Sequence, residues 1–393
     1  MALSRKTIDV VKATAPVVAE HAVEITSTFY PLMFKNNPEV LTFFNKGHQK
    51  EGRQPRALAD AVVAFASHIE DLGAIKPAVD KIAARHVALS VKPEHYAIVH
   101  KNLMAAIGQV LGDAVTPEIG QAWSDAVLAL AGICIDAEEA LYKQAETRKG
   151  GWRYEREFEV SAKEKVAEDT VRFQFKPCDG GSKDGFEFTP GQYLTVRVPE
   201  VSAPRHYTLT SKPGAEYLEI TTRLVSGGDM SNFMHKETKV GDKVLLGAPM
   251  GVYVPEPSGK PAVLVSAGIG ETPMLAFLQS LPRSRIAGAL HVDRSKARHA
   301  FDAIFQDAKL PFYKTVYSSE GAPDVSALAK ELVEATGPDA DYYVCGPNSF
   351  MADIEGALRE QNVSSVISEV FGTGSVRTNT EAQQAMEEAG GAQ

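Results

Sequence analysis

The stretch AVLVSAGIGETPM, residues 262–274, determines the fold of the C-terminal third of the chain. Its apolar beginning predicts a buried strand. Gly268 and Gly270 then open a tight turn into a helix, and Thr272 and Pro273 suit its first turn. Such a turn points a helix N-terminus at an anion and lets the backbone approach a pyrophosphate. Because the third glycine of the dinucleotide fingerprint is absent, the stretch alone fits an ordinary strand-to-helix turn equally well.

Sequence patterns on either side of this stretch divide the rest of the chain. Downstream, apolar strands such as RIAGALHV and YYVCGP alternate with helical segments, which is typical of a parallel α/β sheet. Upstream, from Trp152, the residues alternate as in REFEV, VRFQF, YLTVRV and YLEITTRL, which predicts a mainly β domain. Residues 7–142 show long helical periodicity, interrupted at prolines, and the charged segment KQAETRKGG ends it.

These patterns predict a multidomain protein. We expect an all-α domain in residues 1–147, an antiparallel β-barrel domain in 152–257, an α/β parallel-sheet domain in 258–373 and a polar tail in 374–393. Hydrophobic residues make up 44% of the 393 residues, which is the composition of a folded globular protein. A chain of this length is expected to need more than one hydrophobic core.

Charge and cysteine usage narrow the possible partners and the compartment. The formal net charge of -9, without a Lys/Arg cluster, argues against a nucleic-acid partner. No signal-peptide core and no run long enough to cross a bilayer is found, so we expect no membrane insertion. Cys134, Cys178 and Cys345 are scattered and never form C-x-x-C, which argues against a disulfide framework or a structural zinc site. A reducing cytoplasm fits this usage best.

Three motifs upstream of the glycine turn carry groups that suit a flat, phosphorylated ligand. They are PGQY (190–193), RHYTLT (205–210) and GGDMSNFMH (227–235). Arg205 offers a guanidinium fork for a diphosphate, the ring of Tyr207 can lie against a heterocycle, and Thr208 can reach a ring nitrogen. A second phosphate contact is predicted where two glycines precede the start of a helix, at Gly227, Gly228 and Ser231. The alternative is an ordinary barrel whose Arg and Tyr pair across strands.

Together with AGIGETP and CGPNSFM, these motifs resemble, in order, the ferredoxin-reductase-type FAD and NAD(P)H module over residues 152 to about 372. The resemblance implies that Arg205, Tyr207 and Thr208 bind FAD. It also implies that residues 268–272 cradle the nicotinamide dinucleotide. Further residues near the cofactors would be Gln192 and Tyr193 beside FAD, Cys345, Gly346 and Pro347 flanking the nicotinamide, and Glu369 and Phe371 close to the flavin ring.

The chain departs from that module in three places. Thr208 replaces the usual serine, and FGTG stands where FGP is more common. Glu271 adds a negative charge beside the pyrophosphate turn, which should weaken binding of an anionic cofactor unless the carboxylate points away or pairs. The coenzyme is left open between NADH and NADPH, because Arg294 suits a 2′-phosphate whereas Asp293 suits the unphosphorylated ribose.

In the helical region, the segment KIAARHVALSVKPEHY, residues 81–96, places one histidine in an apolar stripe. Val79, Ile82, His86 and Leu89 recur at helical spacing, so the imidazole shares a face with aliphatic side chains. The segment alone favours a core histidine satisfied by a neighbour over a metal ligand, because most buried polar groups simply find a hydrogen bond. A flavin reductase joined to helices, however, makes a haem acceptor a reasonable expectation.

The order of aromatic and polar residues before His86 resembles the globin domain of flavohemoglobins, and with the reductase module the likeness covers nearly the whole chain. The resemblance implies that His86 is the proximal ligand of a haem b iron, supported by Tyr96 and Glu138. The remaining haem-pocket residues that it implies are Tyr30, Gln54 and Leu58 on the distal face and Phe44 packed on the haem.

The same resemblance implies a nitric oxide dioxygenase. NAD(P)H would reduce FAD, FAD would reduce the haem, and oxygen-bound ferrous haem would convert nitric oxide to nitrate. The expected partners are nitric oxide, dioxygen and NAD(P)H, with no obligate protein partner. Two alternatives stay open: a flavin reductase that acts on ferric, peroxide or quinone acceptors, and a haem-based gas sensor or carrier.

Overall fold

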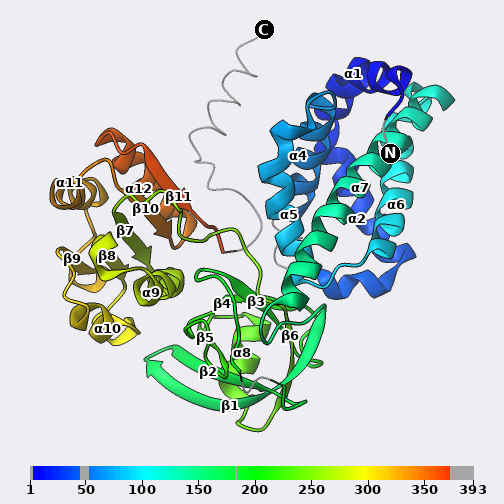
Figure 1. The fold of residues 1–393 in the computed structure, drawn as a ribbon. Helices are drawn as coiled ribbons and strands as arrows, with labels where there is room; N and C mark the ends of the chain where they lie inside the picture. The colour runs from blue at the N-terminus through cyan, green and yellow to red at the C-terminus, as the bar shows by residue number, and fades with distance from the viewer. Residues whose placement is uncertain (1–2, 45–52, 182–183, 372–393) are drawn as a thin grey trace. The chain divides into compact units, whose positions relative to one another are not determined.

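The computed structural model describes residues 3–44, 53–181 and 184–371, with the backbone alone for residues 53–57. The chain forms two compact units, drawn with their helices and strands in Figure 1. The first unit comprises Met1–Phe158, Leu194–His206 and Lys243–Val252, and the second comprises Glu159–Tyr193, Tyr207–Asp242 and Tyr253–Gln393.

Helices make up most of the first unit. They are α1 (Arg5–Glu20), α2 (Ala22–Asn36), η1 (Pro38–Phe43), α4 (Arg53–Ser67), η2 (Leu72–Ile75), α5 (Lys76–Ala88), α6 (Pro93–Leu111), η3 (Gly112–Ala114) and α7 (Pro117–Thr147). Pro93 and Pro117 begin α6 and α7, where the missing N–H leaves no helical hydrogen bond unmade. Thr116 caps α7, since its hydroxyl accepts a hydrogen bond from the N–H of Ile119 at 3.3 Å. α7 continues past Tyr142, where the sequence pattern predicted the end of the helical region.

The helical core forms where α2 packs on α4 and α6, and where α7 packs on α1, α5 and α6. Trp123 of α7 is only 1% exposed, and its Nε1–H donates to Oγ1 of Thr14 on α1 at 2.9 Å. By length and composition α7 could cross a membrane, contrary to the expectation from sequence that no segment could. Its packing on three other helices is that of a core helix in a globular domain.

A six-stranded sheet follows, in the order β4-β3-β6-β1-β2-β5. Its strands are β1 (Glu155–Ala167), β2 (Thr170–Pro177), β3 (Tyr193–Arg197), β4 (Arg205–Thr208), β5 (Leu218–Arg223) and β6 (Lys243–Gly247), with α8 (Asp229–Lys236) between the last two. The pairs β2–β5 and β3–β6 are antiparallel. An antiparallel bridge joins Leu209, next to β4, to Ile220 of β5, so the two edge strands meet and the sheet curls into a barrel.

A separate five-stranded parallel sheet lies in the second unit, in the order β11-β10-β7-β8-β9. Its strands are β7 (Ala262–Ala267), β8 (Ile286–Asp293), β9 (Tyr313–Tyr317), β10 (Asp341–Cys345) and β11 (Ser365–Ser368). Its helical elements are η4 (Gly268–Gly270), α9 (Glu271–Ser280), η5 (Arg283–Arg285), η6 (Lys296–Arg298), α10 (Asp302–Asp307), η7 (Ser318–Glu320), α11 (Val325–Thr336) and α12 (Asn348–Glu360).

This sheet has helices on both faces. Side chains of α11 and α12 share one apolar cluster with the sheet, and side chains of α9 and α10 share the other. All six residues of β7 are buried because β10 and β8 flank it. The strand order reverses between β7 and β10, and ligands of such sheets bind at the carboxyl ends of the strands at this switch point. The predicted fold class, a helical domain followed by an antiparallel and then a parallel sheet domain, is confirmed.

Candidate functional site

His86 lies in the last turn of α5, where α5, α6 and α7 bring three polar side chains together. Its Nδ1 atom lies 2.7 Å from Oε1 of Glu138 on α7 and 3.0 Å from the hydroxyl of Tyr96 on α6. The Tyr96 hydroxyl donates to the same carboxylate oxygen. Because an ionised carboxylate only accepts hydrogen bonds, the proton of the imidazole is on Nδ1 and the Nε2 lone pair is left over. Nε2 has no hydrogen-bond partner among the described residues.

The carboxylate of this triad is buried and accepts two hydrogen bonds. The Glu138 side chain is 3% exposed, whereas that of His86 is 35% exposed. Burial, together with the neighbouring Cys134 and Glu138, raises the pKa of Tyr96 well above its ordinary range, so its hydroxyl remains a hydrogen-bond donor. Burial also raises the pKa of the Cys134 thiol to about 11. A neutral imidazole with a free Nε2, oriented by a carboxylate, is the donor that haem iron requires.

The residues predicted for the opposite side of the pocket also lie in the helical core. Tyr30 is 7% exposed, and its ring centroid lies 5.7 Å from that of Phe44 in an edge-on contact. Burial raises the pKa of Tyr30 well above its ordinary range, so it too stays protonated. Leu58 is partly buried against the same apolar core. The side chain of Gln54 lies outside the described residues.

The PGQY motif and the end of the RHYTLT motif are joined by a backbone hydrogen bond within the second unit. Gln192 is 6% exposed, and its Oε1 accepts a hydrogen bond from the N–H of Thr189 at 2.9 Å. Its carbonyl accepts from the N–H of Leu209 at 3.0 Å, which ties one motif to the other. Gly191 has φ +91°, and a Cβ there would lie 2.1 Å from the carbonyl oxygen of Tyr253, so only glycine fits this turn. Tyr193, which begins β3, is half-buried.

The residues predicted to bind FAD are partly committed to contacts of their own. In β4, Arg205 and Tyr207 are half-buried and Thr208 is 7% exposed. The Arg205 guanidinium donates to the carbonyls of its neighbours Ala203 and Pro204, at 3.1 and 2.9 Å. At the start of α8, Gly227 and Gly228 precede Ser231, whose hydroxyl accepts from the N–H of Val225 at 3.1 Å and so closes the turn.

The glycine turn after β7 and the CGP motif after β10 pack directly on one another. Gly268 has φ +55°, and a Cβ at Gly270 would lie 2.4 Å from the carbonyl oxygen of Cys345. A Cβ at Gly346 would lie 3.0 Å from the Cβ of Ala267. A side chain at either glycine would push the ends of β7 and β10 apart. Glycine at both positions therefore maintains the geometry of the switch point, where ligands of such sheets bind. Thr272 is 2% exposed, and its hydroxyl donates to the carbonyl of Ile269 at 3.0 Å, which stabilises the turn.

The remaining predicted residues lie at or just after the ends of β10 and β11. Cys345 is fully buried, which raises the pKa of its thiol well above its ordinary range, and its Sγ lies 3.4 Å from the carbonyl of Glu369. Pro347 precedes α12 as its N-cap, and Glu369 is half-buried. Phe371 is 45% exposed, and the glycines of the altered FGTG lie outside the described residues.

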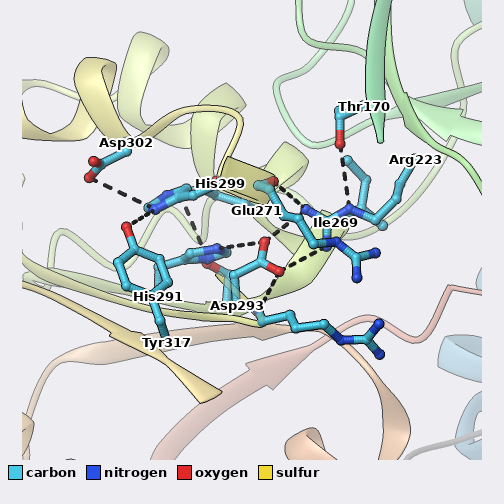
Figure 2. A network of polar contacts seen from close by, with 12 residues as sticks. Thr170, Arg223, Ile269, Glu271, His291, Asp293, His299, Asp302 and Tyr317 are labelled. Carbon is cyan, nitrogen blue, oxygen red and sulfur yellow. Dashed lines mark hydrogen bonds and ion pairs between the residues drawn. The ribbon is translucent and has the colours of Figure 1, made fainter. Parts of the chain in front are cut away.

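A polar network beneath the glycine turn escaped the sequence analysis (Figure 2). Arg223 of β5 donates through Nη1 and Nη2 to the two carboxylate oxygens of Asp293, at 3.2 and 2.7 Å. The N–H of Arg294 also donates to Asp293, at 2.7 Å. Arg223 adjoins the turn, since a Cβ at Gly268 would lie 3.0 Å from its Nη1. From the sequence, Asp293 and Arg294 were considered only as partners of the coenzyme ribose and 2′-phosphate, and Arg223 was not singled out.

The Asp293 carboxylate therefore already has hydrogen-bond partners within the protein. Burial alone would raise its pKa, but the neighbouring His291 imidazole and the hydrogen bonds from Arg223 outweigh burial and hold the pKa far below the ordinary range. The side chain is 3% exposed, and Nε2 of His291 lies 3.5 Å from its Oδ2. A carboxylate has about four acceptor positions, and the Arg223 guanidinium and the Arg294 N–H take three of them, so little remains for a ribose hydroxyl.

Two family models match separate parts of this chain. A Globin family model matches residues 27–134, and an Oxidoreductase FAD-binding domain model matches residues 157–254. A flavohemoprotein of Chromobacterium violaceum is 39% identical over 400 residues, which cover 94% of this chain and 98% of the relative. Flavohemoprotein A of Dictyostelium discoideum is 40% identical over 400 residues, which cover 95% and 99%.

A solved structure gives the same result. The crystal structure of flavohemoglobin from Malassezia yamatoensis with bound FAD and heme matches with a TM-score of 0.81 at 28% identity, covering 95% of this chain and 100% of that one. The likeness thus extends over the helical domain and both sheet domains, and the sequence relatives are matched over nearly their whole length. The chain belongs to the flavohemoprotein family.

Proposed function

We propose that this protein is a nitric oxide dioxygenase, an NAD(P)H-dependent oxidoreductase that uses dioxygen to convert nitric oxide to nitrate. When bound, FAD and haem b supply the redox chemistry, with electrons from NADH or NADPH. The observation that carries the proposal is the contact between Nδ1 of His86 and Oε1 of Glu138, at 2.7 Å, in a chain that also holds a dinucleotide-type turn.

At the haem, the chain would hold the His86 imidazole in place and keep its proton on Nδ1. Glu138 accepts the Nδ1–H of His86, so it orients the ring and increases its basicity through Nε2. Tyr96 donates to Glu138 and keeps that carboxylate in place. A strongly donating ligand suits activation of oxygen better than reversible storage, and this favours turnover over a carrier or sensor.

On the opposite side, Tyr30 supplies a protonated hydroxyl in an apolar environment. A phenol there can donate a hydrogen bond to a bound diatomic ligand without giving up its proton. Phe44 and Leu58 exclude water around it, which strengthens that hydrogen bond. We keep Gln54 as a second polar group of this pocket on the basis of the sequence alone.

In the reductase, the chain binds and orients two cofactors. We assign Tyr207, Thr208 and Arg205 to FAD, together with a set that comprises Gln192, Tyr193, Gly227, Gly228 and Ser231. We assign the switch-point turn to the nicotinamide dinucleotide through Gly268, Gly270, Thr272, Cys345, Gly346 and Pro347, with Glu369 and Phe371 toward the flavin ring. The backbone N–H groups of the turn offer the donors that a pyrophosphate needs.

The test is nitric oxide consumption by the purified holoprotein in aerated buffer with NADH, beside the same measurement on His86→Ala. We expect rapid consumption with nitrate as product, and its loss in the variant. Reduction of ferricyanide by NADH serves as the matched control and should survive His86→Ala, because it needs only the flavin. Nitric oxide consumption that also survives would favour a flavin reductase, and tight gas binding with very slow NADH oxidation would favour a sensor or carrier.

The proposed reaction also implies a role and a location of the protein in the cell. Removal of nitric oxide would protect a cell under nitrosative stress, and a single chain that carries both modules requires no protein partner for electron delivery. We place the protein in the cytoplasm, where NAD(P)H is available and where three scattered cysteines remain reduced.

A further inference from the structure

Glu271 is the one acidic residue in the glycine turn and first helical turn after β7, and its side chain is directed away from solvent. It begins α9 immediately after Gly270, yet it is only 2% exposed. A carboxylate at this position would oppose the two negative charges of a pyrophosphate. The chain must therefore hold this charge where it does not meet the ligand.

The holding group is His299. Its Nε2 lies 2.8 Å from Oε1 of Glu271, and its side chain is fully buried. Its Nδ1 lies 3.1 Å from the hydroxyl of Tyr317 on β9. Because the carboxylate only accepts, Nε2 carries the proton, and the tyrosine hydroxyl can satisfy Nδ1 from the other side. Figure 2 shows His299 between Glu271 and Tyr317.

His291 holds the His299 ring in position by stacking on it. The two imidazole rings stack with centroids 4.1 Å apart and planes inclined by 29°. Nδ1 of His291 lies 2.9 Å from the hydroxyl of Ser266 on β7, and 3.8 Å from Oε1 of Glu271. Lone pairs of stacked rings lie in nearly parallel planes, so both nitrogens cannot point at one metal ion about 2 Å away. The group therefore acts as a hydrogen-bonded support.

Removing His299 would leave a buried carboxylate without its donor. Such a group is costly, and it recovers partners by rotating toward water or toward free N–H groups. The turn itself offers such groups, since the first turn of a helix leaves N–H groups without a helical partner. The carboxylate would then occupy the place of the pyrophosphate.

We propose that His299 is a positioning residue for dinucleotide binding: it holds the Glu271 carboxylate inside the domain and so leaves the turn at Gly268–Gly270 free for the pyrophosphate of NAD(P)H. The proposal rests on the assignment of this turn to the nicotinamide dinucleotide. It does not depend on haem or nitric oxide. His291 contributes by stacking, and Tyr317 by its hydrogen bond to Nδ1.

The test is a double-mutant cycle on the full-length holoprotein, with ADP-ribose as the probe, because it contains the pyrophosphate but no nicotinamide. Its dissociation constant is measured by calorimetry for the parent protein and for His299→Ala, Glu271→Gln and both together. We expect His299→Ala to weaken binding about tenfold or more, the size of one misplaced charge. Glu271→Gln should bind as tightly as the parent, and the double variant should regain most of the lost affinity.

Steady-state reduction of ferricyanide gives the second readout. His299→Ala should raise KM for NADH and leave kcat nearly unchanged, because hydride transfer occurs at the other end of the dinucleotide. His299→Gln should restore binding in part, since its amide can donate to Glu271. His100→Ala, which loses an imidazole contact of 2.9 Å to Ser124 in the helical domain, controls for nonspecific loss of a histidine.

Equal ADP-ribose affinities for His299→Ala and the double variant would overturn the proposal, since a purely structural role is not rescued by removing Glu271. Unchanged affinity in His299→Ala would overturn it as well. If His299→Ala does not fold, the comparison moves to His299→Leu and Glu271→Gln/His299→Leu, in which leucine fills the space but donates no hydrogen bond, and the same criterion decides. A parent protein that binds ADP-ribose but consumes no nitric oxide would contradict the proposed function and leave this inference intact.

Discussion

Glu138 accepts a hydrogen bond from Nδ1 of His86 at 2.7 Å, although 52 residues separate the two side chains in the sequence. The contact joins the last turn of α5 to the middle of α7, and Tyr96 of α6 completes it. A histidine with this support differs from a core histidine that has merely found a partner, because the opposite nitrogen is left with an oriented lone pair.

Replacing Glu138 with Gln should make the haem iron easier to reduce. The amide is a weaker acceptor than the carboxylate, so the His86 imidazole becomes a poorer donor and stabilises ferric iron less. We expect a more positive reduction potential in spectroelectrochemical titration and nitric oxide consumption lower by about tenfold. Haem content should stay the same, and a potential equal to that of the parent would show that Glu138 does not act on the iron through His86.

Tyr30→Phe should loosen bound oxygen without loss of haem. The variant removes one hydroxyl from an apolar pocket and keeps the ring that contacts Phe44. Loss of one hydrogen bond to a partly charged ligand corresponds to about 1.5 kcal/mol or more, so oxygen should dissociate about tenfold faster in stopped-flow measurements. Normal oxygen release together with normal nitric oxide turnover would refute the role given to Tyr30.

The ion pair between Arg223 and Asp293 should stabilise the protein in a pH-dependent way. The Asp293 pKa lies below its usual 3.8, so the carboxylate contributes stability above that value and loses it as the pH falls toward the folded pKa. Asp293→Asn should therefore lower Tm at about pH 7 by calorimetry, and the difference from the parent should narrow toward about pH 3. A difference independent of pH would mean that packing, rather than charge, is responsible.

Replacing Arg223 instead of Asp293 should lower the free energy of unfolding by a larger amount. Arg223→Met leaves a carboxylate that is 3% exposed without its main partner, which destabilises a protein by about 3 kcal/mol or more. The double variant Arg223→Met/Asp293→Asn removes the uncompensated charge and should recover part of the loss. Recovery is measured by urea unfolding of the three variants, and its absence would argue against a charge-based interaction.

Arg294 should favour NADPH. Its side chain is exposed, whereas most acceptor positions of the neighbouring Asp293 are taken up by Arg223 and the Arg294 N–H. A 2′-phosphate would find a cation at this strand end, and a ribose hydroxyl would find little of the carboxylate available. Arg294→Ala should raise KM for NADPH several-fold more than KM for NADH in ferricyanide reduction. Equal changes for both coenzymes would contradict this assignment.

Much of the fold could be predicted because its signals are local. The alternation in REFEV and VRFQF, and the apolar run AVLVSAG before a glycine turn, reflect contacts that each strand makes along its own length. Strands such as β6 and β11 were not singled out, since KVLLG and SVIS are too short to show a period. The end of α7 was placed too early because charged residues in its last turns were interpreted as a linker.

The network around Glu271 could not be predicted, because its members come from different elements. Glu271 begins α9, His291 lies in β8 and His299 follows η6, so only the packing of the sheet brings them together. The sequence does show the negative charge of Glu271 beside a pyrophosphate turn, and such a charge requires a partner. It gave no reason to choose His299, which stands in an unremarkable loop.

The most direct test of the account is the visible spectrum of the purified protein under carbon monoxide, before and after anaerobic addition of NADH or NADPH. We predict a haem Soret band with a flavin shoulder, and its conversion to the ferrous carbonyl form with the nicotinamide coenzyme as the only reductant. That result would connect the glycine turn, the flavin and His86 in one electron path. A flavin spectrum without a haem band after haem supplementation would contradict the account and return His86 to the role of a core histidine.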